Sequence, residues 1–321
     1  MKDVELHYKY SDPKNILLAD GVTRSGKFLL GKILSSFHGV EFLQYSIALE
    51  QIPYLYGMNK IDEGAAIAIL RSIVDYSVYD RYLGRNLNMR ISDRSSIFNS
   101  SNFDKYLQRQ YVNKSNDEVI KFMSDAHRKH LFVTHNILAN INILMKAYTN
   151  ISVIHIVRNP IDLAYSWFKK GYGRPGSIDG LCMNSDISIH DVPFPWFTKD
   201  WDADYTNLNE VDMVIRLIKS IYDCINNELN CLSKIEKEKI LIIQYESLII
   251  NTDSTIKKIS SFLGTDASEG MNETLVKERC PNLDILEKHD MKESIIFGQA
   301  TDEYIEILKN MQKNYNLGIY F

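Results

Sequence analysis

The fold is decided by the stretch Ala19-Asp20-Gly21-Val22-Thr23-Arg24-Ser25-Gly26-Lys27-Phe28-Leu29-Leu30. It follows the apolar run Asn15-Ile16-Leu17-Leu18-Ala19 and precedes a stretch with helical apolar periodicity, so residues 15–37 predict a strand, a glycine loop and a helix. In that order, the backbone N–H groups of the loop and the helix N-terminus point at one place and bind an anion such as phosphate. We therefore expect an α/β fold with an anion-binding loop after its first strand.

One position of the loop differs from the loops that bind nucleoside triphosphates. Gly21 to Lys27 satisfies the pattern G-x-x-x-x-G-K, but Phe28 stands where Ser or Thr would ligate Mg²⁺. The cationic side chains of Arg24 and Lys27 can neutralise a leaving phosphate in place of the metal. The loop therefore suits a nucleotide whose transferred group carries less charge than a γ-phosphate, and we expect no metal.

A second motif supplies a receptor for another phosphate. The apolar run Ser152–Val157 predicts a buried parallel strand, after which Asn159 and Pro160 predict the N-cap and first residue of a helix. Arg158 then lies at the carboxyl end of the strand, the edge where open α/β sheets bind ligands. Its guanidinium can donate two hydrogen bonds to a phosphate, and Ser166, two turns into the helix, can add a hydroxyl.

These two motifs resemble those of the sulfotransferase family that uses 3′-phosphoadenosine 5′-phosphosulfate, abbreviated PAPS. The phosphosulfate loop of that family is similar to Thr23-Arg24-Ser25-Gly26-Lys27, and its 3′-phosphate motif has an Arg followed eight residues later by a Ser, as in Arg158 and Ser166. Three further stretches are similar to the family: Phe132-Val133-Thr134-His135, Pro193-Phe194-Pro195-Trp196-Phe197, and Ile242–Leu248 leading to Ser261-Phe262-Leu263-Gly264. The resemblance covers about half of the chain.

The resemblance implies a site, a reaction and a fold. It implies a sulfotransferase that moves a sulfuryl group from PAPS to a hydroxyl or amine of an acceptor by in-line attack, on a P-loop NTPase-like three-layer α/β fold with a central parallel sheet flanked by helices. The residues expected to bind the donor are Thr23, Arg24, Ser25, Gly26, Lys27, Phe28, Arg158 and Ser166. Arg24 and Lys27 are also expected to act in catalysis, by stabilising the charge on the leaving phosphate.

Two kinds of residue compete for the role of general base. His135 ends a predicted parallel strand, and imidazole with its ordinary pKa of ~6.5 accepts a proton near neutral pH. The cytosolic members of the family have a Lys-Thr-His run here, which Thr134-His135 resembles, although Val133 replaces the lysine. Many glycan-directed members instead use a Glu on the segment after the phosphate loop, where Glu41 and Glu50 are available. We favour His135 and keep both carboxylates as alternatives.

The C-terminal part departs from the family pattern. Cytosolic members carry an Arg-Lys-Gly run that binds the 3′-phosphate, and no such run occurs here. Lys288, His289 and Lys292 lie in the corresponding region, but a solvated surface position is the role that we expect for them. The residues that complete the 3′-phosphate site therefore stay open.

Composition limits the classes of partner. The 321 residues carry a net charge of −4, which argues against a sequence-independent nucleic-acid binder. The four cysteines, Cys182, Cys224, Cys231 and Cys280, have neither C-x-x-C spacing nor suitably spaced histidines, which predicts free thiols. No transmembrane run and no signal-peptide core are visible, so we expect a cytoplasmic protein if the chain is complete.

We expect one sulfotransferase domain over residues 1–321. A substrate-specific insertion is expected at about 46–130, and the Gly- and Pro-rich residues 171–208 predict a long lid-like loop. Trp196, Trp201 and Tyr205 in that loop suit either a stacking surface for a sugar or adenine, or contacts that pin the loop to the core. Without a close match to phenol and steroid enzymes through 46–130, we expect a glycan or glycolipid acceptor of a bacterial type.

Two other functional classes remain. A P-loop kinase or other NTPase is favoured by Gly21 to Lys27 and opposed by Phe28 and by the absence of a convincing strand that ends in an Mg²⁺-binding Asp. A nucleotide-binding module without catalytic activity would keep the donor site and have no use for His135. Dependence on Mg²⁺ separates the first alternative, and the effect of replacing His135 separates the second.

Overall fold

The computed structural model describes residues 15–111, 113–123, 125, 127–174, 186–189, 192–201 and 207–321. The strands are β1 (Asn15–Asp20), β2 (Gln44–Tyr45), β3 (Lys129–Val133), β4 (Ile151–Val157), β5 (Asp186–Ile189), β6 (Val192–Pro195) and β7 (Ile240–Gln244). The α-helices are α1 (Lys27–Leu34), α2 (Ile47–Gly57), α3 (Glu63–Tyr82), α4 (Phe103–Gln108), α5 (Asn116–Met123), α6 (Ile141–Ala147), α7 (Pro160–Phe168), α8 (Glu210–Cys231), α9 (Lys234–Lys237), α10 (Tyr245–Ile250), α11 (Thr252–Leu263), α12 (Met271–Lys277), α13 (Asp284–Glu287), α14 (His289–Phe297) and α15 (Asp302–Asn316). The 3₁₀ helices named within the described residues are η1 (Ile97–Asn99), η2 (Ile137–Asn140) and η3 (Trp196–Thr198).

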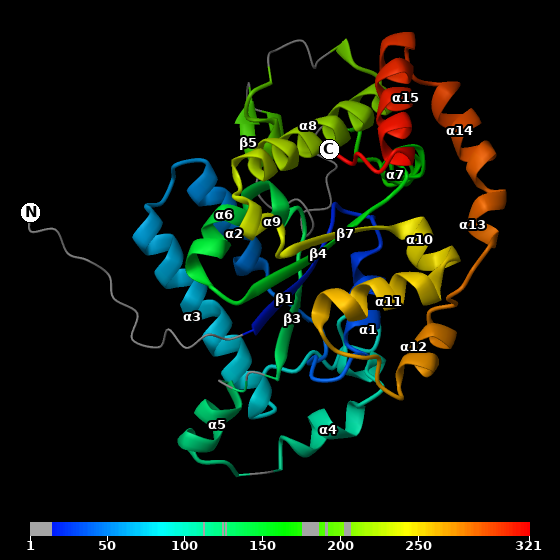
Figure 1. The fold of residues 1–321 in the computed structure, drawn as a ribbon. Coiled ribbons are helices and arrows are strands. Elements are labelled where there is room, and N and C mark those ends of the chain that lie inside the picture. The colour runs from blue at the N-terminus through cyan, green and yellow to red at the C-terminus, as the bar shows by residue number, and fades with distance from the viewer. Residues whose placement is uncertain are drawn as a thin grey trace, which may run out of the picture.

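The centre of the molecule is a parallel sheet with the strand order β2-β3-β1-β4-β7 (Figure 1). The first strand, β1, pairs with β3 on one side and with β4 on the other, so the strand order reverses at β1. Asp20 at the end of β1 lies opposite His155 in β4. Ligands of open parallel sheets bind in the crevice at the carboxyl ends of the strands next to such a reversal. The predicted parallel sheet is confirmed, and it brings the phosphate loop to that crevice.

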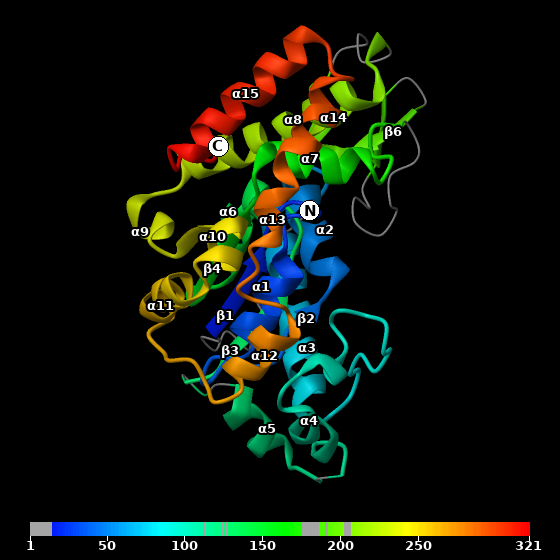
Figure 2. The same cartoon turned by 90° about the vertical axis from the view of Figure 1, so that its right-hand side faces the viewer.

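Both faces of the sheet are buried, because successive side chains of a strand point to opposite faces. Leu18 and Val153 belong to a core shared with α3, α6, α7 and α8, whereas Leu17 and Ile154 belong to a second core shared with α1, α11 and α12. The expected three-layer α/β fold is confirmed. In both views α4 and α5 lie at one end of the molecule, and α7, α8 and α15 lie at the other (Figure 2).

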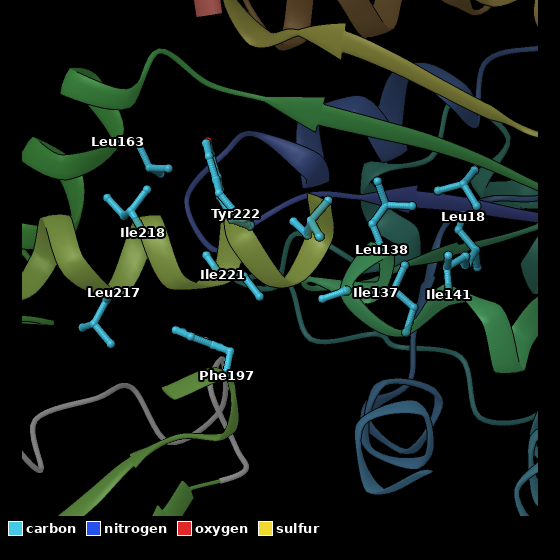
Figure 3. Packing of buried hydrophobic residues seen from close by; sticks show 14 of the residues in the cluster. Leu18, Ile137, Leu138, Ile141, Leu163, Phe197, Leu217, Ile218, Ile221 and Tyr222 are labelled. Carbon is cyan, nitrogen blue, oxygen red and sulfur yellow. The ribbon is translucent and has the colours of Figure 1, made fainter. Parts of the chain in front are cut away.

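The long helix α8 forms much of the first core. Its buried residues Leu217, Ile218 and Ile221 lie among Leu163 of α7 and Phe197 of η3 (Figure 3). Full burial of such an aliphatic side chain stabilises the fold by roughly 1.5–3 kcal/mol. Contacts of this kind hold α7, which carries part of the second motif, against the sheet.

The long helix α8 ends shortly before the short helix α9 begins. It ends at Cys231, and Ser233 begins α9 with a capping box, in which its hydroxyl accepts a hydrogen bond from the Glu236 N–H and its own N–H donates to the Glu236 carboxylate. A Ser followed three residues later by a Glu stabilises the start of a new helix. One helix therefore ends here and another begins, although the apolar pattern continues. Asn159 caps α7 and Pro160 is its first residue, as predicted.

The segment 171–208, expected to be a long lid-like loop, contains an antiparallel hairpin of β5 and β6 in its described part. Of Trp196, Trp201 and Tyr205, the first two contact other elements: Trp196 stacks on Tyr54 of α2, and the indole N–H of Trp201 donates to Ser220 of α8 at 2.9 Å. Tyr205 and Cys182 lie outside the described residues. The other three cysteines are free thiols. Within the described ranges, no helix combines the length and the apolar character that crossing a membrane requires.

Candidate active site

The phosphate loop has a tight backbone geometry that two glycines permit. Gly26, the N-cap of α1, has a φ of 106°, and a Cβ there would lie 2.4 Å from the ring of Tyr245. A Cβ on Gly21 would lie 2.4 Å from the Ser25 hydroxyl and 2.7 Å from the carbonyl of Ile156. Only glycine fits at both positions. The loop is therefore pressed against β4 and α10, with the N-terminus of α1 behind it.

Three buried polar atoms around this loop lack a hydrogen-bond partner among the described residues. They are the hydroxyls of Thr23 and Ser25 and the Nε of Arg158. Leaving a buried donor unpaired costs roughly 1–3 kcal/mol, so native structures seldom leave such donors without a ligand, water or protein partner. The Lys27 side chain is 3% exposed, and its ammonium donates to the Val22 carbonyl at 3.3 Å. These donors fit a multiply charged anion.

The two sequence motifs meet at this loop. Arg158 donates to the Arg24 carbonyl at 2.9 Å, and the Arg24 Nε donates to the Ser166 hydroxyl at 3.2 Å. The next residue of α7, the fully buried Trp167, donates from its indole to the Thr23 carbonyl at 2.8 Å. The structure thus brings together all eight residues that the sequence analysis assigned to donor binding.

Two cavities open on either side of the loop. The larger, of about 340 Å³, has a lining that includes Lys32, Arg158, Tyr245, Ile249, Glu278, Arg279 and Ile285. The smaller, of about 210 Å³, has a lining that includes Thr23, Lys27, His135, Lys170 and Tyr172. Four residues border both cavities: Arg24, Gly26, Phe28 and Arg94. The phosphate loop is therefore the wall shared by a strongly cationic cavity and a cavity that contains the histidine.

His135 and Glu50, which the sequence analysis treated as competing bases, are hydrogen-bonded to each other. Oε1 of Glu50 lies 2.8 Å from Nδ1 of His135 and accepts the backbone N–H of His135 at 2.7 Å. The Glu50 side chain is 12% exposed and the His135 side chain is 5% exposed. The imidazole is flanked by the rings of Phe28 and Tyr45. Since Glu50 engages Nδ1, the nitrogen that can act as a base is Nε2.

Burial raises the pKa of Glu50 to about 8. The positive charge of Lys27 and the N–H donated by His135 oppose this effect, whereas the negative charge of Asp20 adds to it. Because this carboxyl group lies 2.8 Å from the imidazole of His135, protonation of one group affects the other. Such a shift, in a group that contacts a histidine of a cavity wall, is typical of a catalytic acid or base.

Asp20 fixes the segment that carries His135. Its carboxylate accepts hydrogen bonds from the Thr134 hydroxyl at 2.9 Å and the Ile137 N–H at 3.0 Å, and lies 2.7 Å from Nδ1 of His155. Burial alone would raise the pKa of Asp20, but these partners hold it below its ordinary value. Asp20 therefore links β1 and β4 to the segment that follows β3, and its contacts with Thr134 and Ile137 hold His135 in position.

Glu41, the other proposed carboxylate base, lies elsewhere. Its backbone N–H donates to the carbonyl of Lys129 at the start of β3, whereas His135 follows the end of that strand, roughly 15 Å away at ~3.3 Å per residue. The carboxylate is 2% exposed, contacts Arg109 at 2.9 Å and accepts from the Tyr106 hydroxyl at 3.1 Å. It borders neither of the two cavities, and its contacts among the described residues do not include His135, so the structure does not bring it together with the other candidate site residues.

The C-terminal residues also differ from expectation. Lys292 and His289 bind the carboxylate of Asp162 in α7 at 2.8 and 3.1 Å, and Lys292 is only 11% exposed, so it is not a solvated surface lysine. Of the three residues considered, Lys288 is exposed as expected. The cation that the C-terminal region contributes to the larger cavity is Arg279.

Sequence reasoning missed several residues that border the cavities. Arg94 comes from the segment 46–130, and Lys170 and Tyr172 come from the turn after α7. The stretch around Tyr245 was noticed as similar to the family, but a role for its ring was not. None of these residues belongs to a spaced motif, and only the tertiary fold brings them together. Among the described residues, no group of three or more His, Cys, Asp or Glu could hold one metal ion.

The match to a family model agrees with the motifs. Residues 13–282 match the model of the family described as "Sulfotransferase domain". The sulfotransferase domain of the Synechococcus PCC 7002 olefin synthase is 14% identical, with 95% of this chain and 96% of that chain covered and a TM-score of 0.45. The sulfotransferase domain from the curacin biosynthetic pathway is 14% identical, with 81% and 76% covered and a TM-score of 0.43. Sulfotransferase STF1 of Mycobacterium tuberculosis H37Rv is 10% identical, with 88% and 76% covered and a TM-score of 0.40. No curated protein matches the chain.

Proposed function

The chain belongs to the sulfotransferase family, and on this premise we propose that it transfers a sulfuryl group from PAPS to a hydroxyl or amine of an acceptor. The observation that carries the proposal is the meeting of the two motifs around buried donors without partners, at the wall between two cavities. One cavity suits a nucleotide with two anionic ends, and the other is lined by His135, whose ring contacts the Glu50 carboxyl group.

The donor is assigned to the larger cavity. Arg158 and Ser166 would hold the 3′-phosphate, and Arg279, which also lines this cavity, adds a further cation. The hydroxyls of Thr23 and Ser25, with the N-terminus of α1, would hold the phosphosulfate. Arg24 and Lys27 would neutralise the charge that grows on the 5′-phosphate as the bond to sulfur breaks. PAPS supplies the sulfuryl group and this phosphate leaving group.

The acceptor is assigned to the smaller cavity, where His135 acts as the base. The acceptor oxygen or nitrogen forms the new bond to sulfur, the bond from sulfur to the 5′-phosphate oxygen breaks, and the proton of the acceptor passes to Nε2 of His135. Glu50 accepts the Nδ1–H, which holds the ring in the tautomer that has its lone pair on Nε2 and stabilises the imidazolium that forms. Phe28 offers no oxygen to a metal ion at the loop position that kinases use for one. We propose a glycan or glycolipid as acceptor, because the 46–130 segment does not resemble the phenol and steroid enzymes.

Calorimetric titration with PAP, the desulfated donor, tests the donor site. We expect metal-independent binding of PAP that is tighter than that of ATP with or without Mg²⁺. Replacing Arg158 removes a charged hydrogen-bond donor worth roughly 1.5–3 kcal/mol, so Arg158→Ala should weaken PAP binding about 10- to 100-fold. The exposed Arg85, which borders neither cavity, provides the matched control Arg85→Ala. A preference for Mg-ATP, or equal PAP affinity in the two variants, would favour a kinase or NTPase instead.

Replacing His135 tests catalysis apart from binding. His135→Ala should lower kcat by about 10²- to 10⁴-fold, the usual contribution of a general base, and leave PAP affinity unchanged. Release of PAP from PAPS in the presence of an acceptor pool measures this turnover. The exposed His38 gives the control His38→Ala, with wild-type turnover expected. Equal function of all three proteins would support a nucleotide-binding module without catalytic activity.

A further inference from the structure

The smaller cavity carries more positive charge than the donor requires. Nine of the described residues line it. Four of these are cationic, namely Arg24, Lys27, Arg94 and Lys170, and none of the nine is an Asp or Glu. The whole chain has a net charge of −4, so the concentration of positive charge here is local. If Arg24 and Lys27 serve the phosphosulfate, as proposed above, two cations remain for another anion.

Lys170 differs from the other cations in its position. It borders the smaller cavity and does not border the larger one, whereas Arg94 borders both. Neither side chain is paired with a carboxylate in the described ranges, in contrast to Lys32 of the larger cavity, whose ammonium lies 2.6 Å from Glu278. Two exposed, unneutralised cations at one cavity attract and orient an anionic ligand.

The turn that carries Lys170 is attached firmly to the phosphate loop. The backbone N–H groups of Lys170 and Tyr172 both donate to the Trp167 carbonyl, at 3.0 and 3.1 Å. Gly171 between them has a φ of 73°, which allows the chain to reverse. Trp167 contacts the ring of Tyr172 and donates to the carbonyl of Thr23. The base of the Lys170 side chain is therefore fixed relative to the atoms that hold the donor.

We propose that Lys170, together with Arg94, forms a subsite for an anionic group of the acceptor, namely a carboxylate, phosphate or sulfate close to the hydroxyl or amine that is sulfated. This inference rests on the proposed function and adds the class of acceptor: an acidic molecule rather than a neutral one. Arg94 comes from the segment 46–130, the predicted substrate-specific insertion, which fits a role in the choice of acceptor. The subsite binds the ligand by charge and takes no part in proton transfer.

Calorimetry on the protein saturated with PAP tests the subsite, because PAP occupies the cations assigned to the donor. Three probes with the same p-nitrophenyl aglycone are titrated: p-nitrophenyl β-D-glucuronide, p-nitrophenyl β-D-glucoside 6-phosphate and the neutral p-nitrophenyl β-D-glucoside. We expect at least one anionic probe to bind about tenfold or more tightly than the glucoside, and which one does so distinguishes a carboxylate from a phosphate subsite.

Variants connect the preference to the proposed residues. Lys170→Gln should abolish the preference for the anionic probe, and Arg94→Gln should reduce it. The neighbouring Lys169 is equally exposed and borders neither cavity, so Lys169→Gln makes the same change in net charge and should keep the full preference. PAP affinity, measured first on each protein, should be the same for wild type, Lys169→Gln and Lys170→Gln.

The outcomes separate the two proposals. If wild-type protein binds PAP but binds the three probes equally or not at all, or if Lys169→Gln loses as much preference as Lys170→Gln, the subsite is wrong and the sulfotransferase proposal stands. If wild-type protein does not bind PAP, the proposed function fails, and the assignment of the subsite fails with it.

Discussion

Glu41 and Glu50 are nine positions apart in the sequence, and each is a buried carboxylate near β3. Their surroundings shift the two pKa values in opposite directions. Glu41, at the amino end of β3, lies within 4 Å of Arg109, Lys105 and Arg128. Burial alone would raise its pKa, and these cations together with Arg81 hold the pKa well below its ordinary value. Glu50, at the carboxyl end, has a pKa of about 8 because burial outweighs the attraction of Lys27.

The number of cations around each carboxylate explains the difference. A buried carboxylate surrounded by several guanidinium groups stays ionised at any moderate pH and serves as a structural anchor. A buried carboxylate with one nearby ammonium and one imidazole changes its protonation near neutral pH, as a catalytic pair requires. The two glutamates near opposite ends of β3 thus have opposite pKa shifts, which suits Glu41 to stability and Glu50 to the chemistry proposed above.

Removing the charge of Glu41 should have the largest effect on stability. Glu41→Gln leaves the buried guanidinium groups of Arg81 and Arg109 without a counter-charge, and breaking a buried ion pair in this way costs about 3–5 kcal/mol. Urea unfolding should show this loss in the free energy of unfolding, while kcat of the folded protein stays at the wild-type value.

An exposed ion pair provides the control for this change. Glu63 pairs with Lys146, both side chains are at least 40% exposed, and pairs of that kind contribute about 0–1 kcal/mol. Glu63→Gln should therefore cost far less than Glu41→Gln. A stable Glu41→Gln protein with reduced kcat would mean that the two carboxylates had been assigned the wrong way round.

The corresponding change at Glu50 should affect turnover instead. Glu50→Gln can still accept the backbone N–H of His135, but it no longer carries the charge that orients the ring and stabilises the imidazolium, so kcat should fall about 100-fold, within the usual range for acid and base catalysis. In wild type, kcat should rise with pH through about 8, where Glu50 ionises, and this rise should be absent from Glu50→Gln.

The measurement is kcat against pH between 6 and 9, with Glu41→Gln as the comparison protein. Glu41 is ionised throughout that range, so its variant should keep the wild-type profile. An unchanged profile in Glu50→Gln would show that the pH dependence of kcat comes from another group. The assignment of Glu50 and His135 as the pair would then have to be given up.

Sequence patterns predicted the parts of the site that depend on local spacing. The phosphate loop and the Arg158 to Ser166 spacing follow from a strand, a turn and a helix, and parallel strands bring their carboxyl ends to one edge. The family model confirms the family, and the structure confirms the three-layer fold. The roles given to the individual site residues stay predictions.

The pairing of Glu50 with His135 could not be predicted in this way. It depends on β2, a strand of two residues that gives no periodic signal, and on the direction in which α2 leaves it. In the sequence Glu41 and Glu50 are equivalent candidates, because neither belongs to a spaced motif. Their difference comes from Arg109, Lys105 and Arg128, which are distant in sequence and reach Glu41 only in the folded chain.

The smallest expected effect is a difference in how stability depends on pH. The pKa of Glu50 in the folded protein is raised above its ordinary value of 4.5, so its contribution to stability is complete below pH 4.5 and is lost as pH rises through about 8. Glu50→Gln removes this loss, and the free energy of unfolding of the variant minus that of wild type should grow by about 2 kcal/mol between pH 6 and 8.

Glu41 should behave in the opposite way, which makes it the internal control for this measurement. Its pKa is lowered in the folded protein, so its contribution is present above pH 4.5 and is lost only as the pH falls through the folded value. The difference between wild type and Glu41→Gln should therefore stay constant from pH 6 to 8, while the difference for Glu50→Gln changes. If the difference in the free energy of unfolding between variant and wild type stays constant with pH for both variants, Glu50 is ionised throughout this range. The proton of the proposed catalytic pair then resides on the imidazole alone.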